Sequence, residues 1–391
     1  MRFLTTSLTL LLLVFCNACN LKPAEGNIEL VLASEKFDDY LPFLKNKKVG
    51  LLVNHTSMVN NTHLVDTLLA LNVEVTCIFA PEHGFRGKAD AGEHVVSGVD
   101  PRTGIPVVSL YGDNKKPSEE DLQNMDVVIF DIQDVGARFY TYISSMHYMM
   151  EACGENNLKM LVLDRPNPNG DYYNGPVLKK EFQSFVGMHP IPVVHGLTVG
   201  ELANMINDEG WLKDSIKCDL TVIKMDNYHH DMPYSVPVKP SPNLPTDLSI
   251  RLYPSLCFFE ATEISVGRGT LMPFQVIGHP DPRYGSFTFT PESIDGMSKY
   301  PLHQDKMCYG IDLRDRKLDH QFRLNYLIQL YHMSGCQADF FSRRRWFNLL
   351  AGNDTLINKI EAGWSESQIK ESWKSELEAY ANLRNKYLLY P

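Results

Sequence analysis

The chain has 391 residues, of which 44% are hydrophobic, so it is long enough to form two domains with ordinary globular cores. Its formal net charge of −10 and the lack of a block rich in lysine and arginine argue against a nucleic-acid-binding protein, because binding phosphates needs a concentrated basic surface. Glycine-rich phosphate loops, a Gly-x-Ser-x-Gly nucleophile elbow and a His-Glu-x-x-His metal motif are also missing from the sequence, so we expect no cofactor and no metal.

The first element of the chain is predicted to be a targeting segment. Arg2 precedes an apolar stretch at residues 8–15, which is shorter than the roughly 20 residues needed to span a bilayer. Ala18-Cys19 is similar to a bacterial lipoprotein cleavage site, so residues 1–18 are interpreted as the signal peptide and Cys19 as the lipidated residue. Simple secretion is the alternative, because Cys16 stands where such sites usually have leucine. We therefore expect a location in the cell envelope or periplasm, with membrane contact only through a lipid anchor.

The region from residue 27 to residue 235 alternates short apolar runs with helical patterns, as βαβ units do. Such runs are typical of strands that are buried on both faces of a parallel sheet. Helices are expected between the strands, and the capping box Thr198-Val-Gly-Glu201 opens the last of them. The pattern predicts an α/β fold, with a mostly parallel sheet and helices on both faces. The predicted strands are residues 49–53, 75–79, 107–110, 127–130, 160–163 and 193–194, and the predicted helices are residues 63–70, 118–123, 137–155 and 198–210.

A proline-rich segment at residues 233–254 follows and is predicted to be an extended crossover to a second domain. Residues 236–391 are expected to form a smaller α+β domain that closes the cleft. Its strand-like pieces are residues 257–266, 274–278 and 308–313, and its helices are residues 321–333, 355–362 and 367–387.

Polar residues follow most of the predicted strands. In an open parallel sheet the carboxyl ends of all strands lie along one edge, and ligands bind in the crevice outside that edge. Side chains that are far apart in sequence are therefore expected to converge on one active site. These residues are His55, Glu82, His83, Asp131, Gln133, Asp134, Asp164, Arg165, Asn167 and His195. For Asp164 and Arg165 the alternative is that they brace their loop, and for His195 it is a structural role.

Pro81-Glu82-His83-Gly84 is the most informative of these motifs. Apolar neighbours can keep a glutamic acid at a strand end protonated, as a general acid requires; a helix-capping role for Glu82 is the alternative. Asp131, at a strand terminus, is expected to face the cleft, whereas Asp134 could instead cap the next helix.

Two arginines are candidate anion-binding residues. Arg138 and Tyr140 are predicted in the first turn of the helix at residues 137–155, where a cation is unfavourable for the helix dipole, so Arg138 is expected to face a ligand or a carboxylate. Arg268 lies between Gly267 and Gly269, and its planar guanidinium suits a carboxylate or a phosphate; a turn arginine without a ligand is equally compatible. Carboxylates, amides and aromatic residues without a nucleophilic serine or metal cage are typical of sugar chemistry.

Residues 45–390 resemble the bacterial exo-β-N-acetylmuramidase family of the NamZ type. The resemblance rests on a set of short motifs in combination, which are Leu52–Thr56, Phe79–Gly84, Ser109–Gly112, Phe130–Tyr142, Leu163–Pro168, His195–Thr198, Glu201–Ala203, Pro242–Pro245 and Gly267–Thr270.

The resemblance implies a Rossmann-like catalytic domain, a smaller C-terminal domain and an active cleft between them. It also implies exo-acting release of N-acetylmuramic acid from the non-reducing end of peptidoglycan fragments, in cell-wall turnover and recycling. Glu82 would then be the proton donor. Asp131, with Asp134 as the second choice, would stabilise the developing positive charge or orient water. The acetamido group of the sugar could instead act as the nucleophile, as in some glycosidases.

The cation expected for the lactyl carboxylate of the sugar is Arg138 or Arg268. The remaining expected substrate contacts are His55, His83, Gln133, Tyr140, Asp164, Arg165, Asn167 and His195. A non-catalytic envelope module that binds muropeptides or amino sugars is the main alternative, and a carbohydrate esterase or deacetylase is a more distant one. The sequence does not indicate an oligomeric state.

Overall fold

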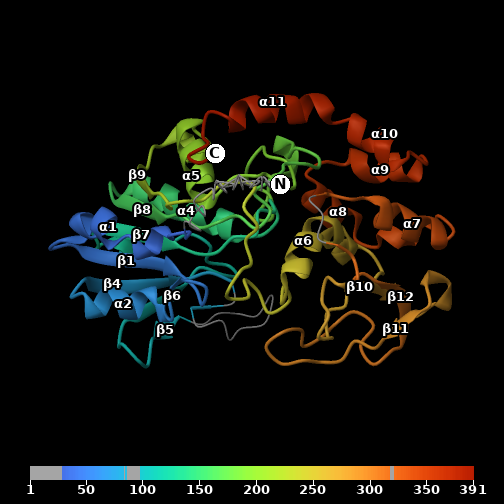
Figure 1. The fold of residues 1–391 in the computed structure, drawn as a ribbon, viewed down its shortest axis with the longest axis horizontal. Helices are drawn as coiled ribbons and strands as arrows, with labels where there is room; N and C mark the ends of the chain where they lie inside the picture. The colour runs from blue at the N-terminus through green and yellow to red at the C-terminus, as the bar shows by residue number, and fades with distance from the viewer. Residues whose placement is uncertain (1–28, 83, 86–96, 318–320) are drawn as a thin grey trace, which may run out of the picture.

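The computed structural model describes residues 29–82, 84–85, 97–317 and 321–391 (Figure 1). The predicted signal peptide at residues 1–18, with Arg2, Cys16 and Ala18, lies outside these ranges, as do Cys19 and His83.

The N-terminal part is built on a seven-stranded sheet with the order β5-β6-β4-β1-β7-β8-β9. All neighbours pair in parallel except β5 with β6, so the mostly parallel sheet expected from the sequence is confirmed. Residues 193–194 are an exception, because Val194 forms only isolated bridges with Ala137 and Asn174. The strands are β1 (Lys48–Val53), β4 (Glu74–Ala80), β5 (Gly98–Val99), β6 (Pro106–Ser109), β7 (Val127–Asp131), β8 (Lys159–Leu163) and β9 (Asp219–Ile223).

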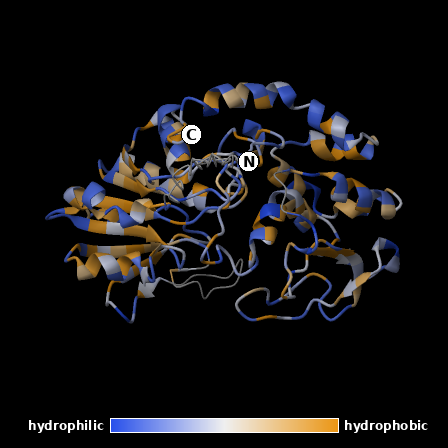
Figure 2. Ribbon diagram, in the orientation of Figure 1, coloured by the Kyte–Doolittle hydropathy of each residue, from blue (hydrophilic) through white to orange (hydrophobic). Residues whose placement is uncertain are grey.

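Helices cover both faces of this sheet. Successive strand residues point to opposite faces, and because both sets are apolar, both faces have to be buried. Phe130 and Val162 belong to one apolar cluster, while their neighbours Ile129 and Leu161 belong to a second. The apolar strands stand out between more polar helices in Figure 2. The helices of this part are α1 (Phe37–Leu44), α2 (Leu64–Ala70), α3 (Glu119–Leu122), α4 (Tyr142–Glu155) and α5 (Val199–Asp208), and a small hairpin comprises β2 (Met58–Val59) and β3 (Thr62–His63).

The C-terminal part combines a small antiparallel sheet, in the order β10-β12-β11, with a set of helices. Its strands are β10 (Val276–His279), β11 (Phe287–Phe289) and β12 (Cys308–Asp312). Its helices are α6 (Asp247–Leu256), the 3₁₀ helix η4 (Cys257–Ala261), α7 (Asn325–Met333), α8 (Arg344–Ala351), α9 (Thr355–Glu361), α10 (Glu366–Glu371) and α11 (Lys374–Arg384).

The proline-rich crossover is shorter than its composition predicts. Helix α6 begins at Asp247 because Thr246 and Ser249 form a capping box that satisfies the first free N–H groups. Pro254 therefore lies inside a helix, near its end, rather than in an extended segment. The segment predicted as a strand at residues 257–266 instead starts with the 3₁₀ helix η4.

The last helix ties the two parts together. In Figure 1, α11 spans from the C-terminal helices back towards α5. The Tyr380 hydroxyl donates to the His195 carbonyl at 2.6 Å, and the Tyr390 hydroxyl donates to Asp164 Oδ2 at 2.7 Å. One apolar cluster runs through both parts and includes Phe79 as well as Phe347. No helix within the described ranges is long and apolar enough to cross a membrane.

Candidate active site

A cavity of about 470 Å³ opens where the carboxyl ends of β4, β6 and β7 meet the C-terminal part. Loops after these strands supply one wall, the crossover segment supplies another, and α6, η4 and α8 supply the third. The principal lining residues are Glu82, Tyr111, Lys115, Phe139, Tyr140, Thr141, Ser184, Phe185, Ser241, Asn243, Tyr253, Glu260, Arg268, Phe274 and Trp346.

Glu82 lies in the turn after β4 and lines this cavity. The Tyr111 hydroxyl donates to its Oε1 at 3.2 Å, and the Thr141 hydroxyl donates to its Oε2 at 3.0 Å. Gly84 has φ of +72° and donates its N–H to the Pro81 carbonyl, a turn that favours glycine because it has no Cβ. The sequence thus places a half-buried carboxyl at the strand end, and hydroxyls from two further loops orient it.

Glu260 is a second carboxylate on the cavity wall. Its Oε1 accepts a hydrogen bond from Nε of Arg268 at 2.6 Å and lies 2.6 Å from Nη2 in the same ion pair, and its Oε2 accepts a weak hydrogen bond from the Cys257 thiol at 3.7 Å. Burial alone would lower the pKa of Arg268, but the contacts with Glu260 outweigh burial and raise it. Gly267 and Gly269 both have φ of +78°, so Arg268 is fixed between two tight turns and is not on a flexible loop. Arg268 therefore lies at the cavity, as the sequence predicted, but its positive charge is already balanced by Glu260.

Aromatic rings form the apolar wall of the cavity. Tyr253 makes edge-to-face contacts with Phe139, Tyr140 and Phe274, with ring centroids 5.3, 5.9 and 5.0 Å apart. The Tyr140 hydroxyl donates to the Pro240 carbonyl at 2.7 Å, which fastens the crossover segment to the loop after β7. Rings of this kind offer flat apolar surfaces to a sugar while they exclude water from it.

Two buried oxygen atoms on the cavity wall have no hydrogen-bond partner among the described residues. They are Ser184 Oγ and Asn243 Oδ1. The amide nitrogen of Asn243 does have a partner, because it donates to the Met297 carbonyl at 2.7 Å, and this fixes the side chain. Buried polar atoms are almost always paired, so a water or a polar ligand is expected to satisfy these two oxygens.

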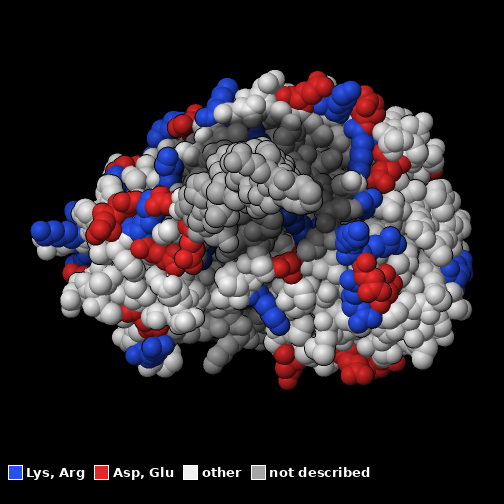
Figure 3. Space-filling view, viewed as in Figure 1, with Lys and Arg blue, Asp and Glu red and all other residues white. Residues whose placement is uncertain are grey.

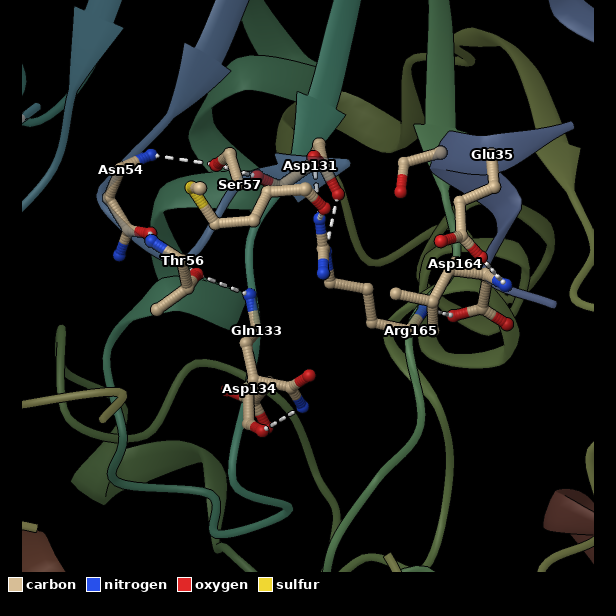
Figure 4. A network of polar contacts seen from close by, with 12 residues as sticks. Glu35, Asn54, Thr56, Ser57, Asp131, Gln133, Asp134, Asp164 and Arg165 are labelled. Carbon is tan, nitrogen blue, oxygen red and sulfur yellow. Dashed lines mark hydrogen bonds and ion pairs between the residues drawn. The ribbon is translucent and has the colours of Figure 1, made fainter. Parts of the chain in front are cut away.

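Asp131 and Arg165 do not line the cavity. They form a buried pair in which Nε and Nη2 of Arg165 reach the two carboxylate oxygens of Asp131 at 2.5 and 2.9 Å (Figure 4). Nη2 also donates to the Met58 carbonyl at 3.0 Å. Neither charge is left for a ligand, which differs from the expectation that Asp131 faces the substrate.

This pair is the centre of what we call the strand-end network, which also contains Asn54, Thr56, Ser57 and Gln133 (Figure 4). The Thr56 hydroxyl donates to Asn54 Oδ1 at 2.6 Å and accepts from the Gln133 N–H at 3.0 Å. The Gln133 side chain donates to the carbonyls of Asp134 and Pro166. The network joins the loops after β1, β7 and β8, so it sets the shape of the sheet edge.

Asp164 and Asn167 are likewise committed to the fold. Asp164 is fully buried at the start of α5 and accepts from the N–H groups of Arg165 and Gly200 and from the hydroxyls of Thr198 and Tyr390. The Asn167 side chain donates to the Leu197 carbonyl at 2.8 Å. Both hold neighbouring loops against one another.

Arg138 is buried away from the cavity. The prediction that it lies in a helix and binds an anion is therefore wrong. Nη1 donates to the carbonyls of Pro176 and Ile191 at 2.7 Å, and Nη2 donates to the Leu350 carbonyl at 2.9 Å. Burial lowers the pKa of Arg138 to about 9. Helix α4 begins at Tyr142 rather than at residue 137, since the Arg138 N–H is bonded to the Val193 carbonyl. The dipole argument therefore does not apply to this arginine.

The three remaining candidates also lie outside the cavity lining. His55 Nε2 contacts the Lys239 carbonyl at 2.7 Å, at the crossover segment. Asp134 Oδ2 accepts from the Gly136 N–H at 2.7 Å and lies 3.8 Å from Nε2 of His195, which is fully buried. No group of three or more potential metal ligands occurs within the part of the chain that the structure describes.

The outer surface of the protein carries charges of both signs. On the face shown in Figure 3, acidic and basic side chains are interspersed, and neither sign forms a continuous block.

Comparison with known proteins identifies the family. Models of the exo-β-N-acetylmuramidase NamZ match residues 49–248 with the N-terminal part of the family and residues 251–390 with the C-terminal part. The chain belongs to the NamZ exo-β-N-acetylmuramidase family. It is 41% identical over 375 residues to the peptidoglycan β-N-acetylmuramidase NamZ of Bacillus subtilis strain 168, covering 90% of this chain and 89% of that protein.

Solved structures support the same family. A DUF1343 family protein from Bacteroides fragilis is similar with a TM-score of 0.86 and 46% identity, covering 93% of this chain and 99% of that one. A second DUF1343 family protein from the same strain has a TM-score of 0.79 and 29% identity, covering 93% of this chain and 100% of the other.

The structure brings Glu82, Tyr140 and Arg268 to the cavity, and it adds residues that were not among the predicted site residues. Glu260 and Lys115 are the charged ones among them. Glu260 could have been suspected because a second carboxylate usually accompanies the first in glycosidases, but no strand-end signal marked it. Lys115 lies in a polar loop without any local pattern that separates it from Lys116.

Proposed function

We propose that this chain is an exo-acting β-N-acetylmuramidase that releases N-acetylmuramic acid from the non-reducing end of peptidoglycan fragments, in cell-wall turnover and recycling. The observation that carries the proposal is one aromatic-walled cavity onto which two carboxyl groups, those of Glu82 and Glu260, both open. A pair of carboxyl groups beside the glycosidic bond is the usual requirement of glycoside cleavage. The name of the Bacillus relative supports the same reaction and the same class of substrate.

Glu82 is the proton donor in this proposal. It protonates the leaving glycosidic oxygen as the bond to the anomeric carbon breaks. The hydroxyls of Tyr111 and Thr141 hold its two oxygens, and a hydroxyl can both donate and accept. The contacts therefore persist when Glu82 changes from carboxylic acid to carboxylate, so the group stays oriented through the reaction.

Glu260 takes the second role, in place of Asp131 or Asp134. Its carboxylate stabilises the positive charge that develops on the sugar ring, or orients the water that attacks it. Arg268 holds one carboxylate oxygen through a hydrogen bond and an ion-pair contact, whereas the second oxygen accepts only the weaker bond from the Cys257 thiol at 3.7 Å among the described residues. Asp131 is unsuited to either role because Arg165 occupies both of its oxygens.

The remaining lining residues bind the sugar in this proposal. Asn243 Oδ1 accepts the N–H of the 2-acetamido group, and the rings of Tyr140 and Tyr253 pack against apolar parts of the sugar. The other predicted contact residues do not touch the sugar in this proposal. They hold the loops that carry the cavity-lining residues. They are His55, Gln133, Asp134, Arg138, Asp164, Arg165, Asn167 and His195.

Replacing Glu82 by glutamine tests the proposal. Glu82→Gln keeps the size of the side chain but cannot donate a proton, so turnover of a chromogenic β-N-acetylmuramide should fall by at least ~100-fold, the low end for general acid catalysis. The melting temperature should stay within about 2 °C of wild type, since the side chain is half-buried and keeps its hydrogen-bonding oxygen. Glu119→Gln, an exposed glutamate on α3, is the matched control.

Two outcomes would count against the enzyme. Near-normal turnover of Glu82→Gln would remove Glu82 from the acid role. If wild-type protein bound the muramide in a calorimeter without releasing product over long incubation, a binding module would replace the glycosidase as the function.

We also propose that the chain works in the cell envelope or periplasm and that a lipid on Cys19 anchors it there. The Ala18-Cys19 junction motivates this proposal. Incorporation of labelled palmitate into wild-type protein, and its loss in Cys19→Ala, is the measurement that tests it.

A further inference from the structure

Lys115 is the one positive charge on the cavity wall that has no anionic partner within the described residues. It belongs to the loop between β6 and α3, and its ammonium lies 5.0 Å from the centre of the Phe185 ring. Its neighbour Lys116 differs, because that side chain pairs with Glu151 at 3.1 Å and with Glu155 at 2.7 Å. Two adjacent lysines thus have different environments, and only the first faces the cavity.

The surroundings of Lys115 are held in place before any ligand arrives. The Phe185 ring stacks on Tyr148 of α4, with centroids 6.2 Å apart and an angle of 13° between the planes. The Phe185 carbonyl also accepts from the Ser144 hydroxyl of the same helix at 2.7 Å. Lys116 also anchors the loop between β6 and α3, which carries both lysines, to α4. A ring under an ammonium attracts it without using its N–H donors, so these remain for a ligand.

The charges on the cavity wall indicate the sign of the ligand. Among the described residues, four charged side chains line it, namely Glu82, Lys115, Glu260 and Arg268. Arg268 is paired with Glu260, and in the proposed reaction Glu82 starts with the proton that it donates. Within this set of four the charge of Lys115 is uncompensated, which favours a ligand with one negative charge.

An uncharged donor lies next to this cation in the chain. Ser184 precedes Phe185, and its hydroxyl is buried on the cavity wall without a partner among the described residues. An ammonium and a hydroxyl are suitable donors for the two oxygens of a carboxylate. Neither phosphate nor sulfate is needed to explain the site, because a single positive charge balances a carboxylate.

We propose that Lys115, assisted by Ser184, forms the subsite that binds the lactyl carboxylate of the muramic acid residue and so distinguishes this sugar from N-acetylglucosamine. The inference rests on the proposed function and names its specificity determinant. Arg268, the other cation in the cavity, serves Glu260 instead.

The test compares two chromogenic substrates that differ only in charge, a β-N-acetylmuramide with a free carboxylate and its lactyl methylamide. Lys115→Met keeps the length of the side chain but removes the charge. It should lower kcat/KM for the carboxylate substrate by about 10- to 100-fold, mostly through KM, because the contact exists before and during bond cleavage. Turnover of the amide should change little.

Two further variants serve as controls. Lys115→Arg restores a cation and should recover most of the preference for the carboxylate. Lys180→Met removes an exposed lysine that does not line the cavity and should leave both substrates unaffected. Melting temperatures show whether each variant is folded.

The outcomes separate this inference from the proposed function. An unchanged preference in Lys115→Met, or an equal loss on both substrates, would overturn the role of Lys115 but not the glycosidase activity. Arg268 would then again be the candidate for binding the lactyl carboxylate. If wild-type protein cleaved neither substrate, the proposed function would fail and this inference with it.

Discussion

The strand-end network and the cavity wall contain the same kinds of residues, but the network stabilises the fold whereas the cavity wall is available to a ligand. In the network, Asp131 and Arg165 are paired within the fold and are almost inaccessible to solvent. On the cavity wall, Glu260 and Arg268 form an equivalent pair that borders open space. Residue type and strand position therefore do not distinguish a structural ion pair from a functional one. What separates them is whether a carboxylate oxygen remains available to a ligand.

The largest expected effect concerns the buried pair. Arg165→Met leaves Asp131 as an unpaired charge inside the fold, so the free energy of unfolding should fall by about 3–5 kcal/mol in urea denaturation at neutral pH. The double variant Asp131→Asn/Arg165→Met should recover part of that loss, because no isolated charge remains. A single variant that kept its stability but lost turnover more than ~100-fold would place the pair in the reaction instead.

The equivalent change on the cavity wall should have the opposite signature. Glu260→Gln should lower kcat/KM by about 10- to 100-fold, which corresponds to roughly 1.4–2.7 kcal/mol in the activation barrier. It should lower the melting temperature far less than Arg165→Met does, because the side chains of Glu260 and Arg268 are 23% and 28% exposed, so water can solvate the charge that remains. Glu263→Gln, an exposed glutamate that does not line this cavity, is the control. Loss of stability without loss of turnover would show that Glu260 is as structural as Asp131.

The smallest effect concerns Glu151, which anchors the loop of Lys115 and Lys116 to α4, and this effect is lost at acid pH. Burial alone would raise the pKa of Glu151, but hydrogen bonds from His147, from the Lys213 N–H and from Lys116 outweigh it and lower the pKa to about 2. The unfolded chain binds this proton near pH 4.5, so the stabilisation is complete above that pH and disappears as the pH falls towards 2.

After allowance for solvent screening, this stabilisation should be about 1–2 kcal/mol. Glu151→Gln should therefore be less stable than wild type at pH 7 and should show a flatter loss of stability between pH 5 and pH 2, measured by urea denaturation. Glu155→Gln, at the exposed partner of the same lysine, should cost less than about 0.5 kcal/mol. Parallel pH profiles for wild type and Glu151→Gln would contradict this account.

Local patterns predicted much of the N-terminal fold. The apolar runs at residues 49–53 and 127–130 became the central strands β1 and β7, and the capping box at Thr198 began α5 as expected. Such signals are local, since a strand buried on both faces needs an apolar run and a helix start needs a cap. The same reasoning placed Glu82 at the sheet edge, where the cavity lies.

The failures share a non-local cause. Residues 137–141 continue the helical pattern of α4, but the Arg138 N–H bonds to Val193, which is distant in the chain, and the helix starts later. The three carbonyls that bind the Arg138 guanidinium come from equally distant segments, so its burial left no mark on the neighbouring sequence.

Local sequence patterns were sufficient to predict the class of fold, the sheet edge at which the chemistry is expected and, through the motifs, the family. They could not predict which polar side chains at that edge are paired within the protein and which are accessible to a ligand. A carboxylate or a guanidinium becomes unavailable when it is paired, and the partners of Asp131 and Arg138 come from distant parts of the chain. Glu82, Glu260 and Lys115 stand apart because the folded chain leaves each of them at the wall of one cavity.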